Sequence, residues 1–331
     1  MFDSSFVLFV LVILVALAFG YVNGWTDAPN AIATVVSTRV LSPRAAVTMA
    51  AILNLAGALT GTAVAYTIGK GVVETGALTQ GTVIAGVGAV IIWSTLAWYY
   101  GLPTSESHGL VAALIGAGIA TAGSHVVHWS VLYRVLMGLV NAPILGFVGG
   151  FFAMFSLLWI LRRSLPSTVQ NVFGKLQIVS AAFMAYAHGK NDGQMPMGII
   201  MMALIVRYGW TEFHVPLWVM VISALSIAVG TATGGWRIIR TIGMRVTKLQ
   251  PVHGFAAETS AAAVVEAASQ LGIPVSTTHC IGSSIMGVGA TRRLSAVRWG
   301  VAGDILVAWI LTYPVCAGLG WVLSKLLGMV I

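Results

Sequence analysis

The stretch GIPVSTTH, residues 272–279, repeats a pattern that first occurs at residues 101–108 as GLPTSESH. Both copies read G-x-P-x-S-x-x-H, and both lie inside long apolar runs. Proline favours the first turn of a helix, and serine and threonine favour its N-cap. The apolar runs that follow, Gly109–Ala120 and Ile281–Ala290, span about half a bilayer by helix rise. We therefore expect each copy to begin a half-helix inside a membrane.

The composition is typical of a protein that crosses the bilayer many times. Of 331 residues, 58% are hydrophobic and only 8% are charged, and the mean hydropathy is +0.94. Soluble domains carry about 25% charged residues. Apolar stretches suited to membrane spans recur along the chain: Val7–Gly20, Ala45–Ile68, Gly81–Tyr100, Val131–Leu161, Val215–Val229 and Val301–Leu323. We expect an all-α polytopic membrane protein.

The net charge of +8 does not indicate a nucleic-acid partner, because the basic residues cluster at the ends of the expected spans. Such clusters are typical of cytoplasmic loops. Before Val7 the chain carries Asp3 and no Lys or Arg, so we expect a multi-pass protein of the cell's inner (plasma) membrane with its N-terminus outside. Val7–Gly20 lacks the basic start of a signal peptide, so we interpret it as a retained span. Cys280 and Cys316 lie in apolar segments and are expected to be small core residues.

An internal repeat links the two opening motifs. Pro103 and Pro274 are 171 residues apart, and at that offset Gly116 meets Gly287. Upstream of each copy lies an acidic motif, NGWTDAPNA at 23–31 and HGKNDGQMP at 188–196. We divide the chain into a first repeat (1–127), connecting spans with a short cytoplasmic loop (128–175), a second repeat (176–298) and a C-terminal span (299–331).

Internal duplication in a membrane protein is typical of a transporter. An odd number of crossings in each repeat would insert the two repeats upside down relative to each other. The equivalent motifs would then meet near the midplane from opposite sides. We therefore expect inverted-topology repeats with discontinuous helices and re-entrant half-helix hairpins.

The serine- and threonine-rich motifs suit an anion. A helix N-terminus offers free N–H groups and a partial positive charge. Hydroxyl donors add to it in both copies: Thr104, Ser105 and Ser107 in the first, and Ser276, Thr277 and Thr278 in the second. The alternative is a helix cap that bonds only within its own bundle. Two copies in matched positions favour a shared oxyanion site.

The acidic motifs suit a cation. Asp27 and Asp192 lie in or beside membrane spans, where a charge is costly and usually functional. Asn30 and Asn191 supply amide oxygens close by. Carboxylate and carbonyl oxygens are ligands for hard cations such as Na⁺. We expect Na⁺ at these four residues and ion-coupled anion uptake, the alternative being aspartates that cap breaks in helices.

The glutamates and histidines in or beside the apolar segments each allow two interpretations of their role. Glu258 is either a second cation ligand or a hydrogen-bonded structural acid. Glu106 is either a proton carrier or a loop residue that faces water. His108 and His279 could donate to an anion, although a lone membrane histidine is more often packed and hydrogen-bonded. The spacing of these residues indicates no metal cluster.

An enzyme is the weaker alternative. Ser105 with His108, or Ser276 with His279, imitates a nucleophile and its base. However, positions i and i+3 of one helix rarely align these groups, and no G-x-S-x-G elbow occurs. We therefore expect no enzyme and no cofactor. An intramembrane hydrolase and an anion channel remain remote alternatives.

The sequence resembles the PiT family of inorganic phosphate transporters. The resemblance rests on motifs in the family's order: NGWTDAPNAIATVVSTRVLSP, GLPTSESHGLVAALIGAGIA, AHGKNDGQMPMGII, HGFAAETSAA and GIPVSTTHCIGSSIMGVGATRR. It implies an inverted-repeat helical fold, usually a homodimer, that carries phosphate inward with Na⁺ or, in some bacterial members, H⁺. It also implies a functional role for Glu258. Sulfate is the runner-up substrate, because hydroxyl and N–H donors alone separate the two oxyanions poorly.

Two positions depart from the family pattern. Thr26 replaces the usual Asn before Asp27, so one amide oxygen is missing. Lys190 stands where the family more often has a small residue. Phosphate and two aspartates bring several negative charges together, so one hypothesis is that the Lys190 ammonium replaces part of a coupling cation. The alternative is that Lys190 extends to water and contacts nothing.

Overall fold

The computed structural model describes residues 4–329, and within this range the regular structure is helical apart from one isolated β-bridge between Val73 and Val127. The first part of the chain forms α1 (Ser4–Ser37), α2 (Pro43–Ala58), α3 (Ala63–Tyr66), a π-helical turn η1 (Thr67–Gly71), η2 (Thr75–Ala77), α4 (Gln80–Tyr100), α5 (Glu106–Ala122), η3 (Ser124–Val126) and α6 (Trp129–Ile160). The second part forms α7 (Pro166–Asp192), α8 (Gln194–Tyr208), α9 (Leu217–Thr233), α10 (Trp236–Arg240), a π-helical turn η4 (Thr241–Arg245), α11 (Pro251–Gln270), α12 (Thr277–Ala290), η5 (Leu294–Ala296) and α13 (Trp299–Leu327).

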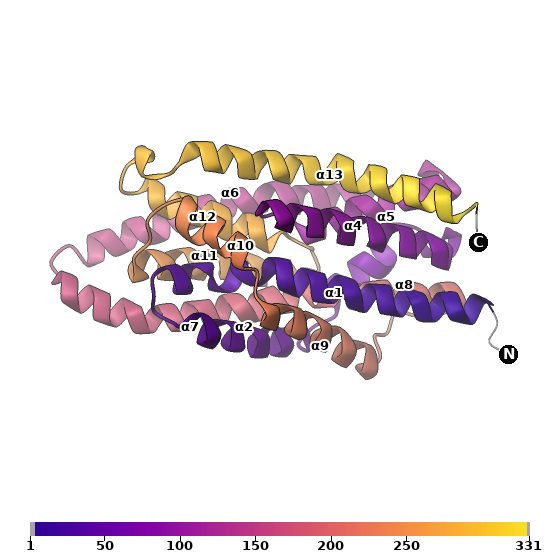
Figure 1. Ribbon diagram of the computed structural model, residues 1–331, viewed down its shortest axis with the longest axis horizontal. Coiled ribbons are helices and arrows are strands. Elements are labelled where there is room, and N and C mark those ends of the chain that lie inside the picture. The colour runs from indigo at the N-terminus through magenta and orange to yellow at the C-terminus, as the bar shows by residue number, and fades with distance from the viewer. Residues whose placement is uncertain (1–3, 330–331) are drawn as a thin grey trace.

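The long helices run along the long axis of the molecule (Figure 1). Helix α13 borders one side of this view, and α2, α7 and α9 border the other, with α1 between them. Helix α1 begins and α13 ends toward the same end of the long axis, and the α6–α7 connection lies at the opposite end. This connection carries Arg162 and Arg163, two of the basic residues expected in the cytoplasm.

Within residues 4–329, four helices are long and apolar enough to cross a membrane: α1, α4, α6 and α13. Two further spans are bent pairs, Pro43–Ala58 with Ala63–Gly71 at 67° and Leu217–Thr233 with Trp236–Arg245 at 59°. The apolar stretch Ala45–Ile68 thus forms a broken helix pair. At the break, the Thr60 hydroxyl donates to Gly57 O at 2.6 Å, and Gln194 Oε1 accepts from Val64 N at 2.8 Å. These side-chain bonds satisfy backbone groups that a bilayer cannot hydrate.

The two G-x-P-x-S-x-x-H motifs begin helices, as the sequence predicts. Ser105 Oγ accepts from His108 N at 3.3 Å, and Ser276 Oγ accepts from His279 N at 3.1 Å. The helices that follow, α5 and α12, have 17 and 14 residues. The glycine that opens each motif has a positive φ, 69° at Gly101 and 68° at Gly272, a conformation that favours glycine. The N-caps and the short helices are thus confirmed.

The order of elements recurs within the chain. The same series occurs twice, from α2 to α6 and from α9 to α13. It consists of a bent helix pair ending in a π-helical turn, then a helix, a half-helix, a short 3₁₀ turn and a long helix. Both π-helical turns begin with the sequence Thr-Ile-Gly, at 67–69 and at 241–243. The exact division of the chain proposed from the sequence stays a prediction.

Each half-helix packs against the long helix of the other part of the chain. Helix α5 lies along α13, and α12 lies along α6. A Cβ atom added to Gly116 would lie 2.0 Å from Ala317 O, and one added to Gly287 would lie 2.1 Å from Phe147 O. Small residues permit this backbone contact, which replaces the hydrophobic effect as the source of helix association in lipid. The pairing of Gly116 with Gly287 in the repeat has this physical reason.

A glycine at the contact of α1 and α9 provides a test of the packing. A Cβ atom at Gly230 would lie 2.0 Å from Tyr21 O, whereas one at Gly174 in α7 would meet nothing within 4 Å. We expect Gly230→Ala to destabilise the protein by at least about 1–3 kcal/mol, because overpacking forces the two helices apart. We expect Gly174→Ala to be neutral or stabilising by up to about 1 kcal/mol through helix propensity.

The measurement is the free energy of unfolding, or the unfolding midpoint, of both variants in the same detergent. Equal stabilities of Gly230→Ala and Gly174→Ala would contradict the close contact of α1 and α9.

Candidate functional site

The two motif aspartates lie on α1 and α7, and both are buried. Helix α1 continues through Asp27 although Pro29 lies inside it. Helix α7 ends at Asp192, and Gly193 separates it from α8. The acidic motif therefore breaks the helix only in the second part of the chain, and in both parts the carboxylate points to other side chains.

The first turn of α12 connects the two aspartates. Thr278 Oγ1 donates to Asp27 Oδ1 at 3.0 Å, and Thr277 Oγ1 donates to Asp192 Oδ2 at 3.4 Å. Asn30 Nδ2 donates to both threonine hydroxyls, at 3.0 Å and 2.9 Å. Residues expected to bind an anion and residues expected to bind a cation thus belong to one hydrogen-bonded network.

The N-termini of α5 and α12 meet at this network. Ser107 Oγ in the first turn of α5 donates to Val275 O, just before α12, at 2.9 Å. All six hydroxyl residues expected at the anion site are buried: Thr104, Ser105, Ser107, Ser276, Thr277 and Thr278. Two helix N-termini, each with partial positive charge, are therefore directed toward the region of two carboxylates.

Asn191 holds the segment that leads into α12. Its Nδ2 donates to Asp192 Oδ1 at 2.5 Å and to Val275 O at 2.8 Å. Its Oδ1 accepts from Ser269 Oγ and from Val275 N. The amide oxygen that the sequence offers as a cation ligand is thus engaged in positioning the chain beside Asp192.

Other acceptor atoms near the aspartates have no hydrogen-bond donor among the described residues. They are Asn30 Oδ1 and Asn23 Oδ1, and both residues are buried. Asn23 Nδ2 lies 3.5 Å from Asp192 Oδ2, which places this residue at the cluster. Unpaired oxygen acceptors beside carboxylates fit the ligand set of a hard cation such as Na⁺. Asn23 begins the first acidic motif, but the sequence analysis assigned it no role.

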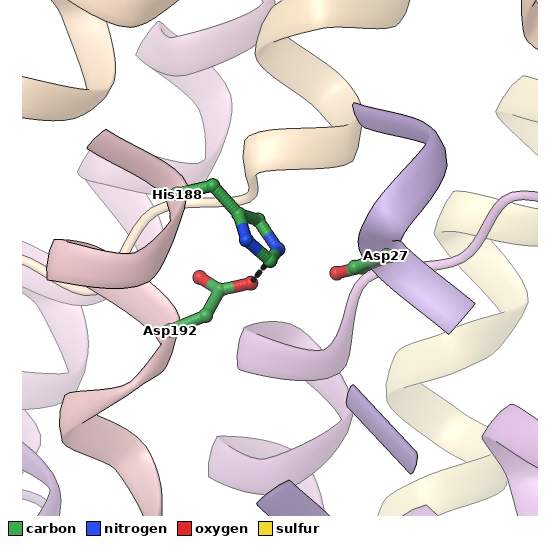
Figure 2. Close-up of side chains that lie close together, drawn as sticks. All are labelled: Asp27, His188 and Asp192. Atoms are coloured by element: carbon green, nitrogen blue, oxygen red, sulfur yellow. Dashed lines mark ion pairs between the residues drawn. The ribbon is translucent and has the colours of Figure 1, made fainter. Parts of the chain in front are cut away.

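His188 is the other residue that the sequence analysis missed. Its Nε2 lies 3.2 Å from Asp192 Oδ2, and Figure 2 shows the ring between Asp192 and Asp27. Ligand atoms of Asp27, His188 and Asp192 lie within 4.8 Å of one another. Spacing along the sequence did not reveal this cluster, because Asp27 and His188 come from different helices.

The orientation of the His188 ring follows from a chain of hydrogen bonds. Thr231 Oγ1 donates to Ile227 O at 2.9 Å and accepts from Asn54 Nδ2 at 2.7 Å. Asn54 Oδ1 therefore accepts, and His188 Nδ1, 3.0 Å away, donates to it. With Nδ1 as the donor, Nε2 is directed at Asp192: it pairs with the carboxylate when it carries a proton, and it offers a lone pair when it does not.

The repeat-related histidines pack against each other and against α13. The rings of His108 and His279 have centroids 4.4 Å apart. His279 stacks on Trp309 at 3.7 Å, and His108 stacks on Tyr313 at 5.2 Å. His108 Nδ1 and Nε2 and His279 Nε2 have no hydrogen-bond partner among the described residues. These side chains are thus packed as expected, but their packing is aromatic.

The two buried glutamates lie in hydroxyl-lined environments. Glu106 Oε1 lies 2.8 Å from Thr26 Oγ1, at hydrogen-bond distance, and Glu106 Oε2 accepts from Ser94 Oγ. The Glu106 side chain is buried. The interpretation of Glu106 as a loop residue facing water is therefore wrong. Glu258 is fully buried and accepts hydrogen bonds from three side chains: Thr34, Ser180 and Gln177. Glu258 and Glu106 thus occupy separate networks.

Lys190 forms an ion pair with Glu266, and both side chains are largely buried. Its ammonium therefore neither extends to water alone nor contacts Asp192. The hypothesis that Lys190 compensates charge at Asp192 therefore has no direct contact between the two side chains to support it.

Comparisons with known proteins identify the family and the fold of the chain. The model of the phosphate transporter family matches residues 23–167 and 161–320. A protein of Rhizobium meliloti (strain 1021), described as a probable low-affinity inorganic phosphate transporter, is 45% identical over 95% of this chain and 94% of its own. A protein of Bacillus subtilis (strain 168) with the same description is 41% identical over 99% of both chains. A solved structure named the sodium-dependent phosphate transporter has the same fold, with a TM-score of 0.90, 23% identity and coverage of 98% of this chain and 100% of its own.

Fold and site together define a multi-pass helical membrane transporter. The chain belongs to the phosphate transporter family. The family and these relatives are transporters, so the enzyme alternative is set aside.

The Thr278 hydroxyl gives the first test of the site. We expect Thr278→Val to lower phosphate uptake by about 10- to 100-fold, since hydrogen bonds to charged groups contribute about 1.5–3 kcal/mol. Thr291→Val at the other end of α12, where Thr291 bonds only to Val288 O, should behave like the wild type. Uptake of radiolabelled phosphate into proteoliposomes measures both variants, and equal rates would contradict a role of Thr278 at the site.

Proposed function

We propose that this protein imports inorganic phosphate coupled to a cation gradient, with Na⁺ as the coupling cation and H⁺ as the alternative. Phosphate would bind at the N-termini of α5 and α12 through the six hydroxyl residues named above. Na⁺ would bind at Asp27, Asn30 and Asp192, with Asn191 holding Asp192 in place beside it. Glu258 would be a further cation ligand in its own network. Asn23 Oδ1 and His188 Nε2 complete the ligand set around the two aspartates.

One observation carries the proposal: Thr277 and Thr278 bond to the two aspartates, so anion donors and cation ligands share a network. A cation bound between the carboxylates would reduce their repulsion of the oxyanion. It would also leave the threonine hydroxyls available to the anion, because the carboxylates would then be satisfied by the cation. Binding of either ion would thus favour binding of the other, which is the requirement for symport.

Phosphate is favoured over sulfate by the family membership of the chain. A chemical reason supports the same choice. Protonated phosphate can donate a hydrogen bond to a carboxylate, whereas sulfate has no proton to donate. The buried carboxylates of Asp27 and Asp192 are acceptors of this kind, and Glu106 is one only while it is ionised.

The membrane arrangement of this proposal is an inverted pair of repeats in the inner (plasma) membrane, with the N-terminus outside and the α6–α7 connection in the cytoplasm. The basic residues of that connection, at the opposite end of the long axis from the start of α1, support this orientation. A homodimer is part of the proposal through the resemblance to the PiT family. The molecular mass in detergent by light scattering would test the homodimer.

The proposed coupling is tested by phosphate uptake into proteoliposomes with an inward Na⁺ gradient, an inward H⁺ gradient, or neither. We expect uptake that depends on a cation gradient and resists an excess of sulfate. Asp192→Asn should abolish gradient-driven uptake, because one carboxylate no longer offsets the charge of the cation. Sulfate transport without phosphate transport would overturn the substrate, and equal uptake without any gradient would overturn the coupling.

A further inference from the structure

The residue that departs from the family pattern, Thr26, contacts another unusual buried group, the carboxyl of Glu106. Thr26 Oγ1 lies 2.8 Å from Glu106 Oε1 and also 2.8 Å from Val22 O in the preceding turn of α1. Both oxygen atoms are at hydrogen-bond distance from one hydroxyl. A threonine hydroxyl carries a single proton, so it can donate to only one of them.

Only a protonated Glu106 satisfies both contacts. If Thr26 donates to Val22 O, the proton between Thr26 and Glu106 must come from the carboxyl group. Thr26 then accepts from Glu106 Oε1, and Glu106 Oε2 accepts from Ser94 Oγ. If Glu106 is ionised, Thr26 must turn its proton toward the carboxylate, and two oxygens with lone pairs then face each other at Val22. The hydroxyls of Thr26 and Ser94 can serve both forms, because a hydroxyl donates and accepts.

Glu106 is buried, and the ionisable groups near it are mostly acidic. The acidic groups that interact with it are Asp27 on α1 and Asp192 on α7, and Cys316 on α13 is a further titratable neighbour. On its own helix His108 has no hydrogen-bond partner among the described residues. Three buried carboxylates and an oxyanion cannot all be charged in a low-dielectric site without compensation. Lys190 is already paired with Glu266.

We propose that Glu106 is a proton-binding residue of the transport cycle, so that one H⁺ accompanies phosphate in addition to the cation at Asp27 and Asp192. This inference rests on the proposed function. A proton from the outer solution binds the Glu106 carboxylate, forms an O–H bond directed at Thr26, and leaves that oxygen on the inner side. A threonine at position 26 can accept a hydrogen bond from a protonated glutamate. An asparagine at the same position would offer its carbonyl oxygen to a metal cation.

The test is Glu106→Gln, an amide of the same shape that never releases a proton. In proteoliposomes with a fixed Na⁺ gradient, we expect net phosphate uptake to fall to the background of protein-free vesicles. Exchange of external labelled phosphate for internal phosphate should persist, because exchange needs no proton release. A pH-sensitive dye inside the vesicles should report acidification with uptake by the wild type and none with Glu106→Gln. Glu74→Gln, which removes an exposed acid far from the site, is the matched control and should match the wild type.

Three outcomes decide the matter. Net uptake and acidification by Glu106→Gln equal to the wild type would overturn the proton site and leave cation-coupled transport intact. Failure of the wild type in both uptake and exchange would instead overturn the proposed function. If Glu106→Gln does not fold, Thr26→Val decides: the pH dependence of net uptake must shift relative to the wild type and to Thr26→Ser, and an unchanged profile would overturn the inference.

Discussion

The burial of two aspartates among helices that cross a bilayer is the constraint on which the rest of the structure depends. Asp27 and Asp192 need hydrogen-bond donors where water is scarce, and the first turn of α12 supplies Thr277 and Thr278. A helix can present its first turn there only if it begins inside the membrane. The serine caps, the left-handed glycines and the short α5 and α12 follow from this requirement.

The sequence was sufficient to predict the parts of the site that depend on local chemistry. The pattern of proline and serine predicted the N-caps at Ser105 and Ser276, because capping involves atoms only three residues apart. It also placed Asp27 and Asp192 in one site through the repeat. The break after α2 was not predicted, because Gln194, whose Oε1 accepts from Val64 N at the break, lies 130 residues further along the chain.

Residues that act through contacts between distant helices could not be predicted in this way. His188 owes its orientation to Asn54 on α2 and Thr231 on α9, which no spacing rule connects with it. Likewise, Thr26 was identified only as a missing amide, and its contact with Glu106, 80 residues later in the chain, gives the substitution a meaning. The sequence therefore identifies the groups of a membrane site more readily than the partners that set their protonation and orientation.

The glycine contacts of the half-helices limit how this transporter can open. Gly116 lies against the backbone of α13, and Gly287 lies against the backbone of α6, so neither half-helix can slide along its neighbour without driving side chains into main-chain atoms. Each half-helix and the long helix packed against it therefore form one rigid two-helix unit. A change of access to the site would therefore move each pair as a unit, and the contact of His108 with His279 lies between the two pairs.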